Sequence, residues 1–267
     1  MIYDLQKANS LKRFMAFLLD LIILIIFVTG FMWIISSITN YDSYSDAMSN
    51  EIAKIEESFG ISDIVKQYDV DLDKFSTMSE EEKNKLPQDV VIALEDCIKS
   101  INSNPEISEA YILMMNLTLL MVSVSFLLSF VILELIVPAI FKNGQTIGKK
   151  IFSLAVMRID GVKVTPLIMF VRSILGKYTV ETMIPLIIIL MAFYGVANIV
   201  MLMVIPLILL FELILIIATK TNSMIHDILS STVLVDLQSQ MIFDSVEAKN
   251  EYRLRLHNEE VKESKYF

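Results

Sequence analysis

Three carboxylates inside long apolar runs are the residues of this sequence best suited to chemistry. They are Asp20, Glu134 and Glu212. A charged side chain within a membrane-spanning segment is costly, so it usually faces the protein interior and binds a proton, an ion or a partner of opposite charge. A chain with three such groups is expected to be a membrane protein whose chemistry lies at these residues.

The depth of the three carboxylates suggests that they share one site. Each lies seven or eight residues from a basic residue that should mark the membrane edge, namely Arg13, Lys142 or Lys220. Because a helix rises about 1.5 Å per residue, all three should lie roughly 10–12 Å deep in a hydrocarbon core of about 30 Å. Their matching depth predicts one polar site, shielded from lipid, for a proton or a small cation.

Long apolar runs predict an all-α membrane protein with about four transmembrane helices. The 267-residue chain is 55% hydrophobic, with a mean hydropathy of +0.61. The first span is expected at Phe14–Ile38 and the second at Ala110–Phe141. Met183–Ala218 should cross twice, because a single helix of that length would span about 54 Å. Gly195 and Asn198 offer the turn, and a broken or re-entrant helix is the alternative.

The distribution of charge predicts the topology. The segment 40–110 holds 17 acids and 6 bases, whereas 142–177 holds 7 bases and one acid. Because basic residues near span ends favour the cytoplasm, we predict a multi-pass protein of the cell membrane with both termini inside. The expected division is 1–39, N-terminus and first span; 40–109, acidic extracytoplasmic insertion; 110–141, second span; 142–182, basic cytoplasmic loop; 183–219, third and fourth spans; and 220–267, cytoplasmic strand and charged tail.

The acidic insertion has the apolar spacing of short helices. Pro87 can start one of them and Pro105 can end it. A small helical cap is therefore expected, with a loosely ordered loop as the alternative. The single cysteine, Cys97, cannot form an internal disulfide, so it is either an inert thiol or part of an intermolecular bridge.

One stretch of the insertion resembles a calcium-binding loop in spacing. Asp69, Asp71, Asp73 and Glu80 occupy the first, third, fifth and twelfth positions. Lys74 stands where such a loop needs glycine for its sharp turn. The spacing therefore favours a solvated acidic stretch, and no metal site is predicted.

The basic loop is expected to carry a small β-structure. Asp160–Gly161 lies between alternating apolar runs, which predicts a β-hairpin whose second strand is Val162–Val164. Its first strand includes Phe152–Val156, and Thr232–Leu237 could add a third strand to the same sheet. Pro166–Leu175 has the pattern of a short amphipathic helix at the inner membrane interface.

The pairing of the buried charges has open alternatives. Asp20 needs a cation, which Arg172 or Lys149 could provide, either as a structural anchor or as a titratable gate. Glu134 and Glu212 have no basic residue in their own spans. If these two face each other, one could hold a proton that a small cation replaces, and the alternative is a protonated glutamic acid with one interhelical hydrogen bond.

The segment Gly144–Lys149 is not a nucleotide-binding loop, because only three residues separate its glycines. Lys149 and Lys150 are expected instead to meet anionic lipid head groups. The spacing suggests no nucleophile with a base, so an enzyme is not expected. Neither a cofactor nor a nucleic-acid partner is predicted.

Several of these segments together resemble the RDD family of bacterial membrane proteins, which is named for one arginine and two aspartates. Arg13 and Asp20 match the pair in the first helix of that family. The stretch Lys142–Val156 resembles its Gly-Gln-Thr-x-Gly-Lys segment and following strand, and Asp160–Gly161 and Arg172 fit the continuation. Ile225–Val235 resembles its closing His-Asp segment, which would make Asp227 the second aspartate.

The resemblance covers residues of about 10–40 and 110–237, and the acidic insertion is longer than is usual for the family. The family's biochemical role is largely undefined, although some members are reported to be sodium/proton antiporters. The resemblance therefore permits transport of Na⁺ or H⁺ without establishing it.

Two functions are expected from the sequence. The first is cation or proton-coupled transport, with Asp20, Glu134 and Glu212 as ligands; its ion-pair or gating partners would be Arg13, Lys149, Arg172 and Asp227. The second is a non-transporting membrane scaffold or accessory subunit that binds a partner through the acidic insertion. Contact with a membrane partner or a second copy is compatible with both.

Overall fold

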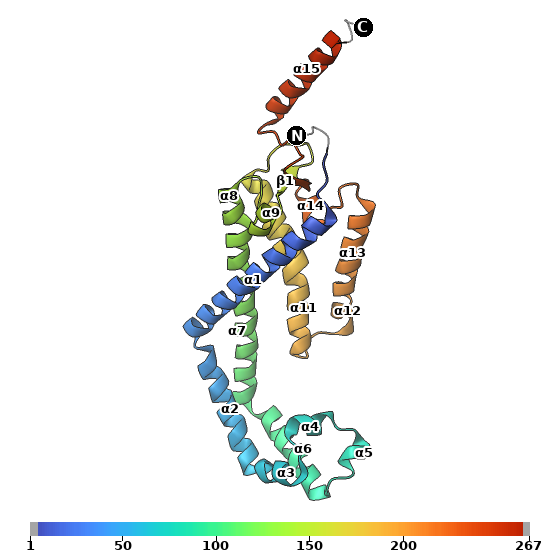
Figure 1. Ribbon diagram of the computed structural model, residues 1–267. Helices are drawn as coiled ribbons and strands as arrows, with labels where there is room; N and C mark the ends of the chain where they lie inside the picture. Colours follow the sequence, from blue (N-terminus) through green and yellow to red (C-terminus); the bar gives the residue numbers. More distant parts are fainter. Residues whose placement is uncertain (1–4, 264–267) are drawn as a thin grey trace. The chain divides into compact units, whose positions relative to one another are not determined.

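The computed structural model describes residues 5–263 and divides the chain into two units (Figure 1). Unit 1 comprises residues 1–32 and 122–267, and unit 2 comprises residues 33–121. Four helices are long and apolar enough to cross a membrane: Ser10–Thr39, Pro105–Phe141, Pro166–Phe193 and Ile199–Ala218. The predicted all-α membrane fold is thus confirmed.

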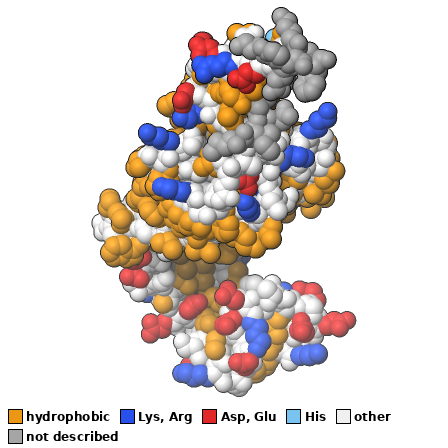
Figure 2. Space-filling view, turned by 45° about the horizontal axis from the view of Figure 1, so that its top comes forward, with side chains coloured by type: hydrophobic (Ala, Val, Ile, Leu, Met, Phe, Trp, Pro, Cys, Tyr) orange, Lys and Arg blue, Asp and Glu red, His pale blue; other side chains and the backbone are white. Residues whose placement is uncertain are grey.

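The four spans are built from nine helical segments within the described residues. In chain order they are α1 (Ser10–Thr39); α7 (Pro105–Phe130), the π-helix η1 (Val131–Ile136) and α8 (Val137–Phe141); α10 (Pro166–Phe170), the π-helix η2 (Val171–Met183) and α11 (Ile184–Phe193); and α12 (Ile199–Leu202) with α13 (Val204–Ala218). Exposed large apolar side chains are concentrated on these spans, and Figure 2 shows the broad hydrophobic area that results.

The third span begins earlier than the sequence suggested. We expected a separate interfacial helix at Pro166–Leu175 and a span starting at Met183, but Pro166–Phe193 is one continuous helix. Arg172 interrupts the apolar pattern of this segment, yet its side chain is only 2% exposed because a partner from another segment pairs with it. The predicted turn before the fourth span is present: Gly195 has a φ of 70°, and Asn198 caps α12 by accepting from the Met201 N–H at 3.0 Å.

Two short strands form the sheet of unit 1. The strand β1 (Leu154–Arg158) pairs antiparallel with β2 (Thr232–Asp236), with Val156 opposite Leu234. The predicted hairpin is reduced to the tight turn at Asp160–Gly161 and a single bridge between Met157 and Lys163. Pro166 starts a helix soon afterwards, so the expected Val162–Val164 strand does not form, and β2 is the strand that pairs along β1.

A short helix precedes each strand: α9 (Ile147–Ile151) comes before β1 and α14 (Ile225–Leu229) before β2. The longer helix α15 (Val246–Glu263) follows near the C-terminal end. Buried apolar side chains of both strands form the core of the sheet, including Leu154, Val156, Val233 and Val235.

Unit 2 is helical and has a core of its own. It contains α2 (Tyr41–Ser58), α3 (Ile61–Tyr68), α4 (Leu72–Thr77), α5 (Glu80–Lys83) and α6 (Gln88–Ser103). Phe75, Leu94 and Cys97 are buried at its centre. Burial also raises the pKa of the Cys97 thiol, which favours the inert thiol over the intermolecular bridge, the other alternative that the sequence left open.

The calcium-like stretch of unit 2 is used for helix capping and ion pairing. Asp71 caps α4 by accepting from the Lys74 N–H at 2.7 Å. The Lys74 ammonium donates to the Asp69 carboxylate at 2.8 Å and to the Asp69 carbonyl oxygen at 2.5 Å. Lys74, at the position where a calcium loop has glycine, thus neutralises the charge of Asp69, at the first position of that loop.

Candidate functional site

Asp20 is held by neutral donors. Its carboxylate accepts from the Thr146 hydroxyl at 2.5 Å and from the Gly148 N–H at 2.8 Å. Thr146 is the N-cap of α9, so Asp20 binds at the start of that short helix. The expected ion pair with Arg172 or Lys149 is therefore wrong, because two hydrogen-bond donors of the Gly-Gln-Thr-x-Gly segment already satisfy this carboxylate.

Close packing of α9 against α1 makes this contact possible. Ala16, one turn before Asp20, is 2% exposed, as expected for a small residue at a helix contact. A Cβ on Gly148 would lie 2.3 Å from the Ala16 carbonyl oxygen and 2.9 Å from the Asp20 carboxyl carbon. Glycine at this position is thus required by space.

Glu134 lies between two lysines. It belongs to the π-helix η1, is 6% exposed, and forms ion pairs with Lys177 of η2 and with Lys149 of α9. The Lys149 Nζ–Glu134 Oε2 distance is 3.6 Å, and neither atom has a hydrogen-bond partner among the described residues. The helices η1 and η2 are also joined by the Ser173 hydroxyl of η2, which donates to the Glu134 carbonyl oxygen at 3.1 Å.

Arg172 and Asp227 form the most deeply buried ion pair of the described residues, each 2% exposed. Arg172 also donates to the Thr232 hydroxyl of β2 at 2.5 Å, and Asp227 accepts from the Met224 N–H at 3.2 Å. Burial raises the pKa of Asp227, but Arg172 and His226 outweigh that effect and hold it at about 2. This predicted ion-pair residue is therefore a carboxylate near neutral pH.

A chain of polar contacts runs from Asp227 to Glu212 through two residues that the sequence reasoning did not select. His226 Nε2 lies 3.7 Å from Asp227 Oδ1, and His226 Nδ1 lies 2.8 Å from both oxygens of Glu181. The Glu181 carboxyl group in turn interacts electrostatically with the nearby Glu212 carboxyl group. Burial and Arg172 lower the pKa of His226, which favours its neutral form.

Glu212 has an oxygen without a donor. No residue of α13 is fully buried, yet Glu212 Oε1 is inaccessible to solvent and has no hydrogen-bond partner within the part of the chain that is described. Its carboxyl neighbour is Glu181 and not Glu134, which corrects the expectation that Glu134 and Glu212 face each other.

Arg13 binds backbone oxygens at the end of the fourth span. Its guanidinium donates to the Asn222 carbonyl oxygen at 2.8 Å and to that of Thr221 at 3.4 Å. Carbonyls that follow a helix C-terminus lack intrahelical donors, so an arginine satisfies them. The arginine and aspartate of α1 thus hold two different segments against the same helix.

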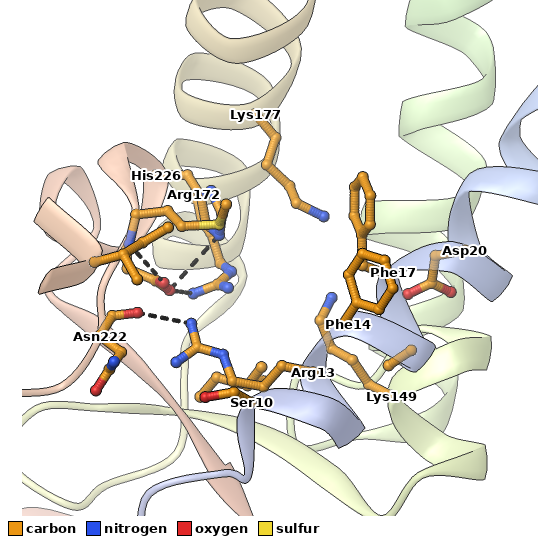
Figure 3. A pocket seen from close by; sticks show the side chains of 15 residues that line it. Ser10, Arg13, Phe14, Phe17, Asp20, Lys149, Arg172, Lys177, Asn222 and His226 are labelled. Atoms are coloured by element: carbon orange, nitrogen blue, oxygen red, sulfur yellow. Dashed lines mark hydrogen bonds and ion pairs between the residues drawn. The ribbon is translucent and has the colours of Figure 1, made fainter. Parts of the chain in front are cut away.

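These groups surround a cavity of about 350 Å³ in unit 1. Arg13, Asp20, Lys149, Arg172 and Asp227 all line it, whereas Glu134 and Glu212 do not. Figure 3 shows the amino groups of Lys149 and Lys177 directed into the space between Arg172 and the rings of Phe14 and Phe17. The predicted single cluster of three carboxylates is therefore replaced by three separate environments around one largely cationic cavity.

Lys149 and Lys150, which we expected at the lipid head groups, have different surroundings. Lys150 is exposed, and its ammonium lies 3.6 Å from the centre of the Phe141 ring. Lys149 is 6% exposed. Burial lowers its pKa; Glu134 opposes this and Lys177 adds to it, giving about 8. Lys149 is therefore not the surface lysine at the membrane edge that we had expected.

The π-helix η2 supplies most of the residues that were missed. A π-helix bonds residue i to i+5, so side chains four or five positions apart share a face. Arg172, Lys177 and Glu181 have this spacing, and Gly176 on η2 allows His226 to approach so closely that a Cβ would lie 2.5 Å from the His226 Cβ. An α-helical period would place Arg172 and Glu181 on opposite faces, so the sequence alone did not show this stripe.

Comparison with known proteins gives one family. A model of the RDD family matches residues 7–231. Neither the curated proteins nor the solved structures include a significant match to the chain. The family match spans the charged residues of the polar network described above, and it ends one residue before Thr232.

Proposed function

Because the chain belongs to the RDD family of membrane proteins, we propose that it exchanges a proton for a small monovalent cation, such as Na⁺, across the cell membrane. The exchange site in this proposal is the carboxyl pair Glu181–Glu212. The observation that carries the proposal is the interaction of two neighbouring carboxyl groups on two candidate spans, together with the buried, donor-free Oε1 of Glu212.

The chemistry of such a pair suits exchange. Two carboxylates in contact cannot both remain ionised without a compensating charge, so they share a proton or bind a cation. With one proton the pair carries a charge of −1, and with both groups ionised and one Na⁺ bound the charge is again −1. One ion can thus replace the other without changing the electrostatic balance in the membrane.

The surroundings of the pair provide a connection to the cavity. Glu181 contacts His226, which lines the cavity together with Asp227 and Lys177. Neutral imidazole can receive a proton on one nitrogen and release it from the other. In this proposal His226 connects the exchange site to the cavity, which opens toward the cytoplasm if the basic loop is on that side, as its charge predicts.

The remaining predicted candidates have another role in this proposal. Asp20 accepts two hydrogen bonds and Glu134 forms ion pairs with two ammonium groups, so neither can exchange ions without losing those partners. We assign them to positioning α9 and η2 around the cavity. Arg172 and Asp227 hold α14 and β2 against η2.

Flux measurements on the purified full-length protein test the proposal. Proteoliposomes with an internal pH dye should show proton flux when a Na⁺, Li⁺ or K⁺ gradient is imposed. Glu212→Gln and Glu181→Gln should reduce this flux to the level of empty liposomes, whereas the matched control Glu95→Gln, at an exposed position in unit 2, should leave it unchanged. Absence of flux with every cation in the unsubstituted protein would exclude exchange.

A second candidate function is partner binding through unit 2. Its own buried core and its net charge of −11 over residues 40–110 favour a folded, acidic recognition unit. Replacing Glu80, Glu81 and Glu82 by glutamine should then reduce recovery of a defined partner from membranes, with transport unaffected. If recovery of every co-purified protein is unchanged, the acidic face of α5 is not a binding surface.

A further inference from the structure

The cavity has more cationic than anionic groups on its wall. Four of its lining residues carry permanent or near-permanent positive charge, namely Arg13, Lys149, Arg172 and Lys177, against two aspartates. Both aspartates are engaged: Asp20 by Thr146 and Gly148, and Asp227 by Arg172 and Met224. The wall therefore has little unused capacity to accept hydrogen bonds.

Unused donors are present on the same wall. Lys149 is 6% exposed and its Nζ has no hydrogen-bond partner in the described part of the chain; the nearest acidic oxygen, on Glu134, is 3.6 Å away. The Nε of Arg172, which is 2% exposed, is likewise unpartnered among residues 5–263. A buried ammonium without an acceptor is costly, and an anion in the cavity would supply the acceptor.

The other side of the cavity is apolar and lies within the spans. Phe14 and Phe17 of α1, each 53% exposed, and Ile216 of α13 line it. Figure 3 places the two rings beside the amino groups of Lys149 and Lys177. A ligand that fits both sides has an anionic group at one end and a hydrocarbon chain at the other.

We propose that this cavity binds the anionic head of a membrane amphiphile, with a phosphate or carboxylate on Lys149, Lys177 and Arg13 and the hydrocarbon chain along Phe14 and Phe17. A volume of about 350 Å³ is at the small end of ligand cavities and fits a head group, not a whole lipid. The chain of the amphiphile stays in the bilayer. His226 connects this cavity to the Glu181–Glu212 pair, but lipid binding in it does not depend on ion exchange.

Lipid titration of the full-length protein in detergent tests this site. Native mass spectrometry should show phosphatidylglycerol retained on the protein, and phosphatidylcholine of the same acyl chains retained at least about tenfold less. Both lipids carry a phosphate, but the choline cation of phosphatidylcholine is repelled by the cationic wall. Inorganic phosphate is the third probe. If phosphate alone displaces phosphatidylglycerol at comparable concentration, the anion supplies the affinity and the hydrocarbon chain does not.

Neighbouring lysines provide matched variants. Lys149→Gln should weaken phosphatidylglycerol retention about tenfold, whereas Lys150→Gln should leave it unchanged, because Lys150 lies over Phe141 and does not line the cavity. Arg13→Gln, at a half-buried position, provides a second variant if Lys149→Gln fails to fold. Glu212→Gln should retain the lipid.

Three results would overturn the site. The first is equal retention of phosphatidylglycerol and phosphatidylcholine, and the second is an equal effect of Lys149→Gln and Lys150→Gln. The third is that both Lys149→Gln and Arg13→Gln still prefer phosphatidylglycerol as strongly as the unsubstituted protein does. If no cation drives proton flux but the protein still prefers phosphatidylglycerol, ion exchange is rejected and the lipid site is kept. The two proposals are therefore tested separately.

Discussion

A carboxylate within the membrane needs a donor, a cation or a proton, and this chain uses different solutions for different residues. Asp20 accepts two hydrogen bonds, Glu134 pairs with two lysines, and we propose a shared proton or cation for Glu212. The sequence reveals that these residues are unusual because each interrupts an apolar run. It does not reveal their partners, since Thr146 is 126 residues from Asp20 and Lys177 is 43 residues from Glu134.

Breaking the Arg172–Asp227 pair should destabilise unit 1 strongly. Arg172→Ala leaves a buried aspartate without its counter-charge, which typically costs about 3–5 kcal/mol. Arg158→Ala is the matched control, because its pair with Asp160 is 36% and 40% exposed and should contribute less than about 1 kcal/mol. Equal shifts of the two variants in urea unfolding would contradict a structural role for the buried pair.

The charge on Lys149 should couple folding to pH in the alkaline range. Its pKa is about 8 in the folded protein, below the ordinary lysine value of 10.5, so the unfolded chain binds more protons between these values. The unfolding free energy should therefore rise with pH from about 8 to about 10, by on the order of 1 kcal/mol per unit. Urea unfolding at successive pH values should show this slope in the unsubstituted protein and not in Lys149→Gln.

At the scale of elements, two π-helices and two glycines position the network. The helix η1 carries Glu134 and η2 carries Arg172, Lys177 and Glu181. Apolar length alone predicted the first two spans, but the start of the third was missed. Its polar face is buried against α14, which is about 50 residues later in the chain, and hydrophobic periodicity does not report such long-range pairing.

Adding one methyl group at the α1–α9 contact should separate these helices. In Gly148→Ala the new Cβ would lie 2.3 Å from the Ala16 carbonyl oxygen, so the expected loss is about 1–3 kcal/mol, together with weaker Asp20 bonds. Gly30→Ala in α1 has no atom within 4 Å and should be neutral or stabilising by up to about 1 kcal/mol. Thermal unfolding compares the stability of the two variants. Equal unfolding midpoints of Gly148→Ala and Gly30→Ala would show that the α1–α9 contact tolerates a side chain.

At the scale of the whole molecule, the chain combines a membrane unit with a separately cored helical unit. The composition of the insertion predicted a helical, acidic segment, and its helices and the core around Phe75 and Leu94 agree with that. The side of the membrane on which each unit lies stays a prediction from the charge of the basic loop.

The single cysteine offers a direct probe of the core of unit 2. Phe75→Ala should remove about 3–5 kcal/mol from this core and accelerate alkylation of the buried Cys97. Ile92→Ala, at a 50% exposed position on α6, should change the alkylation rate little. Rapid alkylation of Cys97 in the unsubstituted protein would contradict a folded core.

The shared proton of Glu181 and Glu212 is the claim on which the proposed function depends most, and infrared spectroscopy of the full-length protein observes it directly. A protonated carboxyl group absorbs at a different frequency from an ionised carboxylate, so a spectrum at neutral pH should contain a band of a protonated carboxyl group. Glu212→Gln should remove this band, and Na⁺ or another transported cation should diminish it. A protonated band that is absent, or that responds neither to cations nor to this substitution, would contradict the account.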